Sequence, residues 1–258
     1  MDTNVTIDMR NGVAGDMLLS AMLDFHGGET YDLVEDISVA SSVMKPTSVE
    51  VRRVERHGRE AFILDVSWEG ENDKAVSGED MKDYLRDALS ESTISSAGRS
   101  VSERILDEIL EAESVAHLVQ DPESVHLHEA GTPDTLVDTV GLGMLFERLE
   151  LDGAWIQGTP ISLGYGKVNT EHGLLEIPVP AVRAMIRNIP VRSGPVPGEL
   201  ATPTGVASAK SMVEVWMDHR SGGDGAVIPG KRVGSGAGHR LYEAPFRNVL
   251  DIYLSEVP

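Results

Sequence analysis

The chain has 258 residues, of which 41% are hydrophobic, so it can bury a core and is too apolar for a disordered chain. Its formal net charge is −20, from 42 acidic and 22 basic residues, which disfavours nucleic-acid binding because that binding needs clustered Lys and Arg. It contains no cysteine, which excludes disulfides, thiolate zinc sites and cysteine nucleophiles. Any bound metal must therefore be held by His, Asp or Glu side chains, by the backbone or by a substrate.

The hydropathy of the chain predicts a cytoplasmic protein with no membrane partner. No run approaches the roughly 20 consecutive apolar residues of a membrane helix, and the first residues, MDTNVTIDMR, include no apolar stretch of signal-peptide length. Only six of the basic residues are lysine, and an acidic, lysine-poor surface suits concentrated salt, where repulsion between like charges is screened. We expect a halophilic protein; an ordinary acidic protein is the alternative.

Strand-like and helix-like runs alternate along the chain. The runs on either side of 57–58 are expected to form a β-hairpin. Asp16 is expected to cap the first helix. Two Thr-Pro pairs, at 132–133 and 202–203, are expected to open later helices, with threonine as N-cap and proline at the first helical position. In chain order we expect a strand at 4–9, a helix at 17–25, strands at 47–55 and 60–68, helices at 81–92 and 100–118, a strand at 124–129, a helix at 136–149, strands at 154–164 and 173–180, helices at 181–189 and 204–216, and a C-terminal region of strands and glycine-rich loop.

This order predicts an α/β or α+β fold with a mixed sheet, alternating helices and one β-hairpin. We expect one domain over residues 1–258, with a weak internal boundary near 70–80.

The segment VHLHEAGTPDTLVD gathers two histidines and three carboxylates. On a strand, His126 and His128 point to the same face, with Glu129 at the strand end. Asp134 and Asp138 are four residues apart and share a face near a helix start. Imidazole and carboxylate ligands suit a borderline divalent metal such as Ni²⁺ or Zn²⁺, and a His or Glu there could instead transfer a proton. The alternative is that Asp134 stabilises the helix dipole and the histidines are surface or packing residues.

The segment DMRNGVAGDM predicts a second site. A strand, a glycine loop and a helix start form an anion site, with backbone N–H groups facing the ligand. Asn11, Gly12 and Gly15 shape this loop, but Asp8 and Asp16 are negative, so a phosphate would need a cation or the loop backbone alone. A tight turn with Asp16 as helix cap explains the same pattern.

Three further motifs have a functional and a structural interpretation. His172 precedes a strand and is either a functional or a structural histidine. Glu199, Thr202 and Thr204 stand at a helix start and either bind a ligand or form a capping motif. The glycines of 234–240 either let the backbone approach a ligand closely or make a flexible loop.

In this order, the motifs D-x-x-x-G-x-x-G-D-M, H-x-H-E-x-G-x-x-D-x-x-V-D, P-V-P-A, GELATPTG and GSGAG resemble the LarC family of nickel-insertion proteins. The resemblance runs from Asp8 to about Leu250. It implies a nickel chelatase or cyclometallase of the lyase class, acting in the biosynthesis of the nickel-pincer nucleotide cofactor used by lactate racemase-type enzymes. Nickel would be inserted into pyridinium-3,5-bisthiocarboxylic acid mononucleotide through one carbon–nickel and two sulfur–nickel bonds, with CTP consumed in the presence of Mn²⁺ or Mg²⁺.

The resemblance, together with the clustering of these residues, assigns roles to them. The residues expected to bind nickel are His126, His128, Glu129, Asp134 and Asp138. The residues expected to act in catalysis are His128, Glu129 and His172. The residues expected to bind the mononucleotide are Asp8, Asn11, Gly12, Gly15, Asp16, Glu199, Thr202 and Thr204.

The sequence also departs from the family. The loop at 69–80 has no histidine tract, and no C-terminal nucleotide-binding domain follows the last predicted strand. A separate chain could supply that domain, or this chain could perform part of the reaction. Asn11 and Pro133 replace the usual serine and small residue. The alternatives are a non-catalytic nickel carrier and a His/Asp metal-dependent hydrolase, and a homo-oligomer stays open.

Overall fold

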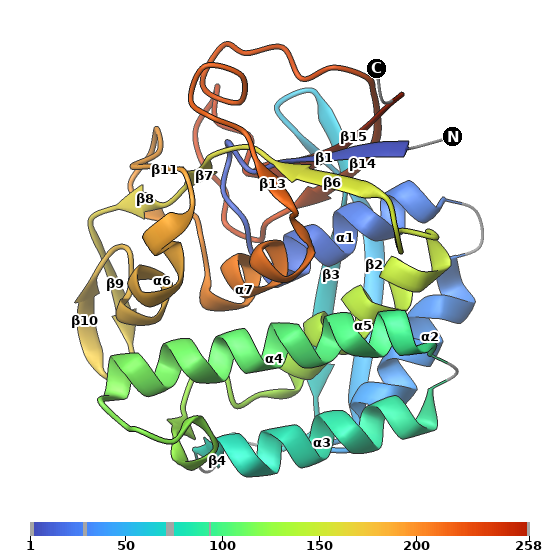
Figure 1. Ribbon diagram of the computed structural model, residues 1–258, viewed down its shortest axis with the longest axis vertical. Helices are drawn as coiled ribbons and strands as arrows, with labels where there is room; N and C mark the ends of the chain where they lie inside the picture. The colour runs from blue at the N-terminus through green and yellow to red at the C-terminus, as the bar shows by residue number, and fades with distance from the viewer. Residues whose placement is uncertain (1–2, 28–29, 71–74, 93, 257–258) are drawn as a thin grey trace.

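The protein is described here by a computed structural model, shown in Figure 1. The structure describes residues 3–27, 30–70, 75–92 and 94–256. Residues 71–74 lie outside the described residues. They include part of the expected internal boundary near 70–80 and part of the 69–80 loop that has no histidine tract.

The main sheet of the described residues has seven strands in the order β13-β6-β1-β15-β14-β3-β2. These strands are β1 (Thr3–Asp8), β2 (Thr47–Arg56), β3 (Arg59–Trp68), β6 (Trp155–Gly158), β13 (Val215–Trp216), β14 (Lys231–Ala237) and β15 (Val249–Glu256). Strand β6 is parallel to β1 and β13, and β14 is parallel to β3, whereas the β1/β15, β14/β15 and β2/β3 pairs are antiparallel. The expected mixed sheet with helices is therefore confirmed.

Smaller strand pairs and the helices complete the described fold. The short strands are β4 (Val76–Ser77), β5 (His126–Leu127), β7 (Ile161–Ser162), β8 (Gly164–Tyr165), β9 (Lys167–Thr170), β10 (Gly173–Glu176), β11 (Val191–Arg192) and β12 (Gly198–Glu199). The helices are α1 (Gly15–His26), α2 (Thr30–Ser41), α3 (Gly78–Glu91), α4 (Ser96–His117), α5 (Pro133–Arg148), α6 (Pro180–Met185) and α7 (Pro203–Met212). Single 3₁₀ turns occupy Pro122–Ser124 and Ile186–Asn188.

The expected hairpin is confirmed as β2 and β3. Both turn residues have positive φ, 48° at His57 and 78° at Gly58, which a two-residue turn between twisted strands requires. Side chains alternate across the sheet, so Phe62 and Leu64 enter the main core while Ala61 packs on the opposite face. The described residues contain a second hairpin, β9/β10, which the sequence did not predict.

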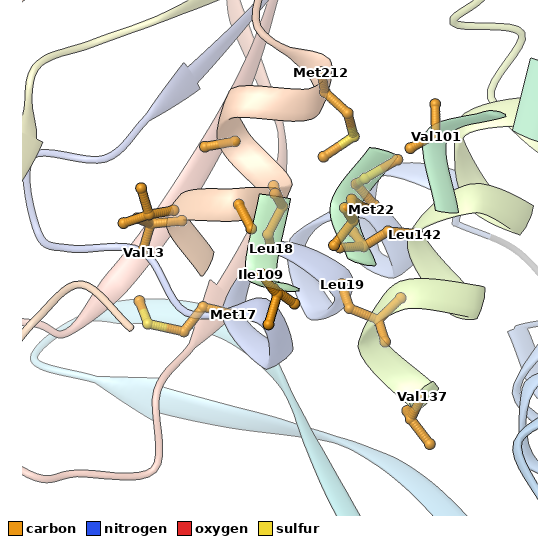
Figure 2. Close-up of a cluster of buried hydrophobic side chains, with 14 of the residues drawn as sticks. Val13, Met17, Leu18, Leu19, Met22, Val101, Ile109, Val137, Leu142 and Met212 are labelled. Carbon is orange, nitrogen blue, oxygen red and sulfur yellow. The ribbon is translucent and has the colours of Figure 1, made fainter. Parts of the chain in front are cut away.

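The main core lies between the sheet and the helices, and each of the seven helices of the described residues contributes buried side chains to it. Figure 2 shows Met17, Leu18 and Leu19 of α1 among side chains from α4, α5 and α7, including Ile109 and Leu142. All five of these side chains are buried.

Two glycines of the GSGAG segment bring α1 against the sheet. A Cβ on Gly234 would overlap the carbonyl oxygen of Ala21, and one on Gly236 would overlap that of Met17. These glycines lie in β14. They therefore permit close helix packing, and the prediction of a ligand approach or a flexible loop was wrong for them.

Other local predictions are both confirmed and corrected. Thr202 caps α7 and accepts a hydrogen bond from the Gly205 N–H at 3.1 Å, as predicted. Asp16 does not cap α1, because Ala14 is the N-cap and the Asp16 carboxylate accepts from Met17 N–H within the first turn. Helix α2 had no sequence prediction.

The expected strand at 124–129 shrinks to the two residues of β5, since most of this segment is a turn and a loop. In the described part of the chain, no helix combines the length and the apolarity needed to cross a membrane. The β9/β10 hairpin and α6 sit together beside the C-terminal end of α4, at the left of Figure 1. This arrangement forms the candidate site.

Candidate functional site

Three histidines from separate segments form a cluster, which we call the histidine cluster. His117 ends α4, His128 follows β5, and His172 lies in the β9/β10 turn. Their ring centroids are 4.7 Å apart for His128 and His172, 5.0 Å for His117 and His172, and 6.0 Å for His117 and His128. Helix α4 stops at this point because Leu118 adopts the left-handed conformation, with φ 58°.

The histidine cluster borders a pocket of about 290 Å³, which we call the histidine pocket. Glu113 of α4, Glu129 after β5 and Glu199 of β12 line it together with His117 and His172. The rest of the lining is mostly apolar: Ala116, Thr170, Leu175, Val179, Pro180, Ala181 and Pro203. A few polar groups in a mostly apolar cavity are typical of a small-molecule site.

Burial changes the protonation of this pocket. Burial, followed by repulsion from Glu129, raises the pKa of Glu113 and that of Glu199 to about 7. Burial also lowers the pKa of His117, and repulsion from His172 and then His128 adds to this effect. The two glutamates can therefore accept or donate a proton near neutral pH, and the His117 imidazole tends to be neutral, as metal binding requires.

One hydrogen bond and two close carboxylate–imidazole contacts connect the residues around the pocket. The backbone N–H of Glu171 donates to Glu129 Oε1 at 2.9 Å. His128 Nδ1 lies 3.5 Å from Glu171 Oε2, and His117 Nε2 lies 3.5 Å from Glu113 Oε2. Two of the histidines thus have a carboxylate close to a ring nitrogen, which can orient the ring.

Two of the three ring spacings suit a shared metal ion, and the 6.0 Å between His117 and His128 is too wide. With metal–nitrogen bonds of about 2.1 Å, rings on one ion have centroids about 4.5–5 Å apart. In the part of the chain that the structure describes, however, no three His, Asp or Glu side chains are arranged to hold a metal ion. Binding nickel here would require side-chain rotation or ligands supplied by a substrate.

A second group, which we call the carboxylate cluster, consists of Asp16 of α1 with Asp134 and Asp138 of α5. His239 adjoins it, with Nε2 3.5 Å from Asp16 Oδ2. Asp138 is 1% exposed, and its Oδ1 has no hydrogen-bond partner among the described residues. Gly15 permits this approach of α1 to α5, because a Cβ there would overlap the Asp138 carboxylate.

The pKa values of the carboxylate cluster are raised. Burial and then repulsion from Asp134 raise the pKa of Asp16 to about 6, although His239 opposes the shift. Burial raises the pKa of Asp138 well above its usual value, and Asp134 and Asp16 add to this, while a hydrogen bond with Thr204 opposes it. Burial also raises the pKa of Asp134. The cluster therefore favours a bound proton or a cationic ligand.

The start of α7 connects the two groups. Pro203 lines the histidine pocket, and the next residue, Thr204, contacts Asp138. The Thr204 hydroxyl is also 3.1 Å from that of Thr202. Glu199, Thr202 and Thr204, predicted as binding residues, thus lie along one edge shared by both groups.

The predicted nickel residues are not brought together. Glu129 lines the histidine pocket and His128 belongs to the histidine cluster beside it, whereas Asp134 and Asp138 adjoin Asp16 instead. His126 is exposed, in β5, and takes no part in the ring contacts of the described histidines. The physical reason is that β5 is too short to carry both histidines on one strand face.

The residues of the predicted mononucleotide-binding loop do not all line one site. Asp8 pairs with Arg10, 2.6 Å from Oδ2 to Nη2, and lines another pocket together with Asn11. Gly12 has φ 104° and packs against Leu200, so it serves a close backbone contact.

The sequence prediction missed Glu113 and His117. Their signal was present, because residues four apart near the end of the predicted helix at 100–118 share a face. Nothing in the local sequence, however, indicates that this face meets His128 and His172.

An α/β fold with a pocket of imidazole and carboxylate groups has the donor set that a borderline divalent metal prefers. A model of the nickel insertion protein family matches residues 5–257, and the chain belongs to that family.

Several curated relatives match most of this chain. It is 35% identical over 251 residues to a putative nickel insertion protein of Methanothrix thermoacetophila, covering 96% of this chain and 58% of the relative. It is 31% identical over 252 residues to the pyridinium-3,5-bisthiocarboxylic acid mononucleotide nickel insertion protein of Clostridium kluyveri, covering 95% and 60%. The protein of the same name from Staphylococcus saprophyticus is 29% identical over 245 residues, covering 95% and 58%. The chain thus spans about three fifths of these relatives' length, and no solved structure matches it.

Proposed function

We propose that this chain inserts nickel into pyridinium-3,5-bisthiocarboxylic acid mononucleotide. The observation that supports this most strongly is the meeting of His117, His128 and His172 in one cluster beside a pocket, in a member of the nickel insertion protein family. Two relatives that match nearly all of this chain carry that activity in their names.

In this proposal the three histidines hold nickel loosely until the substrate arrives. No three described side chains form a closed metal site, so the two thiocarboxylate sulfurs of the substrate would complete the coordination. Nitrogen ligands alone bind a borderline metal less firmly than a mixed nitrogen and sulfur set. Nickel would therefore move from the protein to the substrate.

Formation of the carbon–nickel bond requires the pyridinium ring to lose a proton. Glu113 and Glu199, each with a pKa raised to about 7, are the proposed proton acceptors. Glu129 adds negative charge to the pocket, which favours a cationic ring. His128, Glu129 and His172 keep their predicted functional roles here, and Glu113 and His117 are added to them.

The remaining features of the reaction are also proposals. They are consumption of CTP with Mn²⁺ or Mg²⁺, assignment to the lyase class, and a separate chain equivalent to the rest of the relatives' length. A homo-oligomer, a cytoplasmic location and adaptation to salt stay predictions. A nickel carrier would retain metal without any turnover in the presence of CTP.

The test is equilibrium dialysis of Ni²⁺ against the full chain in concentrated KCl, with and without the mononucleotide. We expect nickel retention to rise with the mononucleotide. His128→Ala should lower that retention at least about tenfold, because a lost metal ligand costs this much or more. His126→Ala is the matched control and should retain nickel like the unaltered chain.

Equal losses in the His126 and His128 variants would contradict the assignment to the histidine pocket. Nickel retention that is the same with and without the mononucleotide would contradict nickel insertion and favour a nickel carrier.

A further inference from the structure

A second polar cavity, of about 210 Å³, lies outside the histidine pocket. Four arginines line it, and we call it the arginine pocket: Arg10, Arg59, Arg192 and Arg247. They come from the loop after β1, the start of β3, β11 and the segment before β15. Three aspartates, Asp8, Asp224 and Asp251, line the cavity as well, so its lining has a slight excess of positive charge in a chain whose net charge is −20.

Several donors in this pocket lack acceptors. Within the described part of the chain, Arg59 has a single ion pair, 3.3 Å from Nη2 to Asp251 Oδ2. Arg247 donates to the other described residues only through Nε, at 3.3 Å to the carbonyl oxygen of His57. The Tyr253 hydroxyl has no hydrogen-bond partner among the described residues. Burial, followed by repulsion from Asp251, raises the pKa of Tyr253, so the hydroxyl keeps its proton.

Two of the carboxylates in the pocket are already engaged. Asp8 accepts from Arg10 through both oxygens, at 2.8 Å from Nε and 2.6 Å from Nη2. Asp251 accepts from the Ser235 hydroxyl at 2.5 Å. Arg10 offsets the charge of Asp8, and Arg59, 3.3 Å from Asp251 Oδ2, partly offsets that of Asp251, so these two acids repel an incoming anion less than free carboxylates would.

The third carboxylate, Asp224, occupies the place where an anion could bind. Its side chain is 83% exposed and pairs with Arg192 Nη1. The Arg192 guanidinium is otherwise fixed, with Nε donating to the Ser162 hydroxyl and Nη2 to the Arg10 carbonyl, both at 2.7 Å. An exposed acid on a fixed arginine can be displaced by a ligand of higher charge.

We propose that the arginine pocket binds a phosphate group, through Arg59, Arg247 and the Tyr253 hydroxyl, with Arg192 released from Asp224. Phosphate suits this donor set because it has several acceptor oxygens and carries more charge than a carboxylate. Asn11 also lines the arginine pocket. The next residue, Gly12, packs on Leu200, and Leu200 follows Glu199 of the histidine pocket. This segment therefore connects the two pockets. The phosphate source is either the mononucleotide or a nucleoside triphosphate; this last identification rests on the proposed function, whereas the anion site does not.

The test is calorimetric titration of the full chain, without nickel and at one fixed salt concentration. The probes are inorganic phosphate, the mononucleotide, its dephosphorylated nucleoside and CTP with Mg²⁺. Arg247→Ala should weaken phosphate binding about tenfold or more, and Tyr253→Phe about threefold, because charged hydrogen bonds contribute more than neutral ones. Asp224→Asn should strengthen binding, since it removes the internal competitor, and Arg86→Ala on exposed α3 is the control.

The outcomes separate the possible sources. If the Arg247 and Tyr253 variants bind the mononucleotide more weakly but bind its nucleoside unchanged, the site holds the substrate phosphate. If they lose affinity for CTP alone, the site holds a triphosphate. Unchanged affinity of every phosphate probe in the Arg247 and Tyr253 variants overturns the site, as does weaker binding in Asp224→Asn. His128→Ala should keep its phosphate affinity, so failure of the nickel assay and failure of this site are distinguishable.

Discussion

Replacing Glu199 by Gln should stabilise the protein at alkaline pH and leave its stability unchanged in acid. Burial and the charge of Glu129 raise the pKa of Glu199 from 4.5 to about 7 in the folded protein. Below pH 4.5 this side chain is protonated in both folded and unfolded states. Between pH 4.5 and 7 only the unfolded chain ionises, so the free energy of unfolding falls as pH rises. Glutamine cannot ionise and avoids this loss.

The size of the effect follows from the same pKa difference. At about 1.4 kcal/mol per pH unit, the loss in the unaltered protein reaches at most about 3 kcal/mol above pH 7. Glu199 is only partly buried in a pocket that opens to solvent, and solvent screening reduces the expected gain to about 1–2 kcal/mol.

The assay is urea unfolding of both proteins at pH 4, 6 and 8, with salt held constant. The difference in unfolding free energy should be near zero at about pH 4 and reach about 1–2 kcal/mol at about pH 8. Glu214→Gln, at an exposed position, controls for the general removal of one negative charge. A difference that does not change with pH, or that matches the Glu214 variant, would refute the raised pKa of Glu199.

Three further substitutions test the fold around the sites by urea unfolding. Gly236→Ala should cost about 2–3 kcal/mol, because its Cβ overlaps the Met17 carbonyl oxygen and α1 must move away; a cost below about 1 kcal/mol would contradict this packing. Thr202→Ala should cost about 1 kcal/mol through loss of the α7 cap, and Thr202→Ser should restore most of it. Arg10→Leu should lower the free energy of unfolding by about 3 kcal/mol or more, since it leaves Asp8 buried without its partner. Adding Asp8→Asn should recover part of this loss. A double variant that loses the sum of the two single losses would contradict an interaction between Arg10 and Asp8.

The sequence predicted the local elements well because their signals are local. The alternation of apolar and charged residues identified β2 and β3, with the turn at 57–58 between them. The Thr-Pro pairs at 132–133 and 202–203 identified the starts of α5 and α7. The Asp16 cap failed because the chain enters the helix earlier, at Ala14.

Function was predictable at the level of the family because several motifs occur in one order, and the family match over 5–257 confirms that. The site itself was only partly predictable. His128 and His172 were both predicted as site residues, and the structure brings their rings together, a contact that the sequence did not predict. His117 and Glu113, which complete the group, occur on a helix whose pattern looks purely structural.

The sequence by itself determined the charge, the ligand types available, most helices and strands, and the family. Only the tertiary structure decided which polar groups meet, because residues from α4, β5, β9/β10 and β12 converge at the histidine pocket from distant parts of the chain. The same holds for the separation of Asp134 and Asp138 from His128, and for the four arginines of the second cavity. Side-chain burial and pairing depend on packing between elements, and local sequence patterns do not specify that packing.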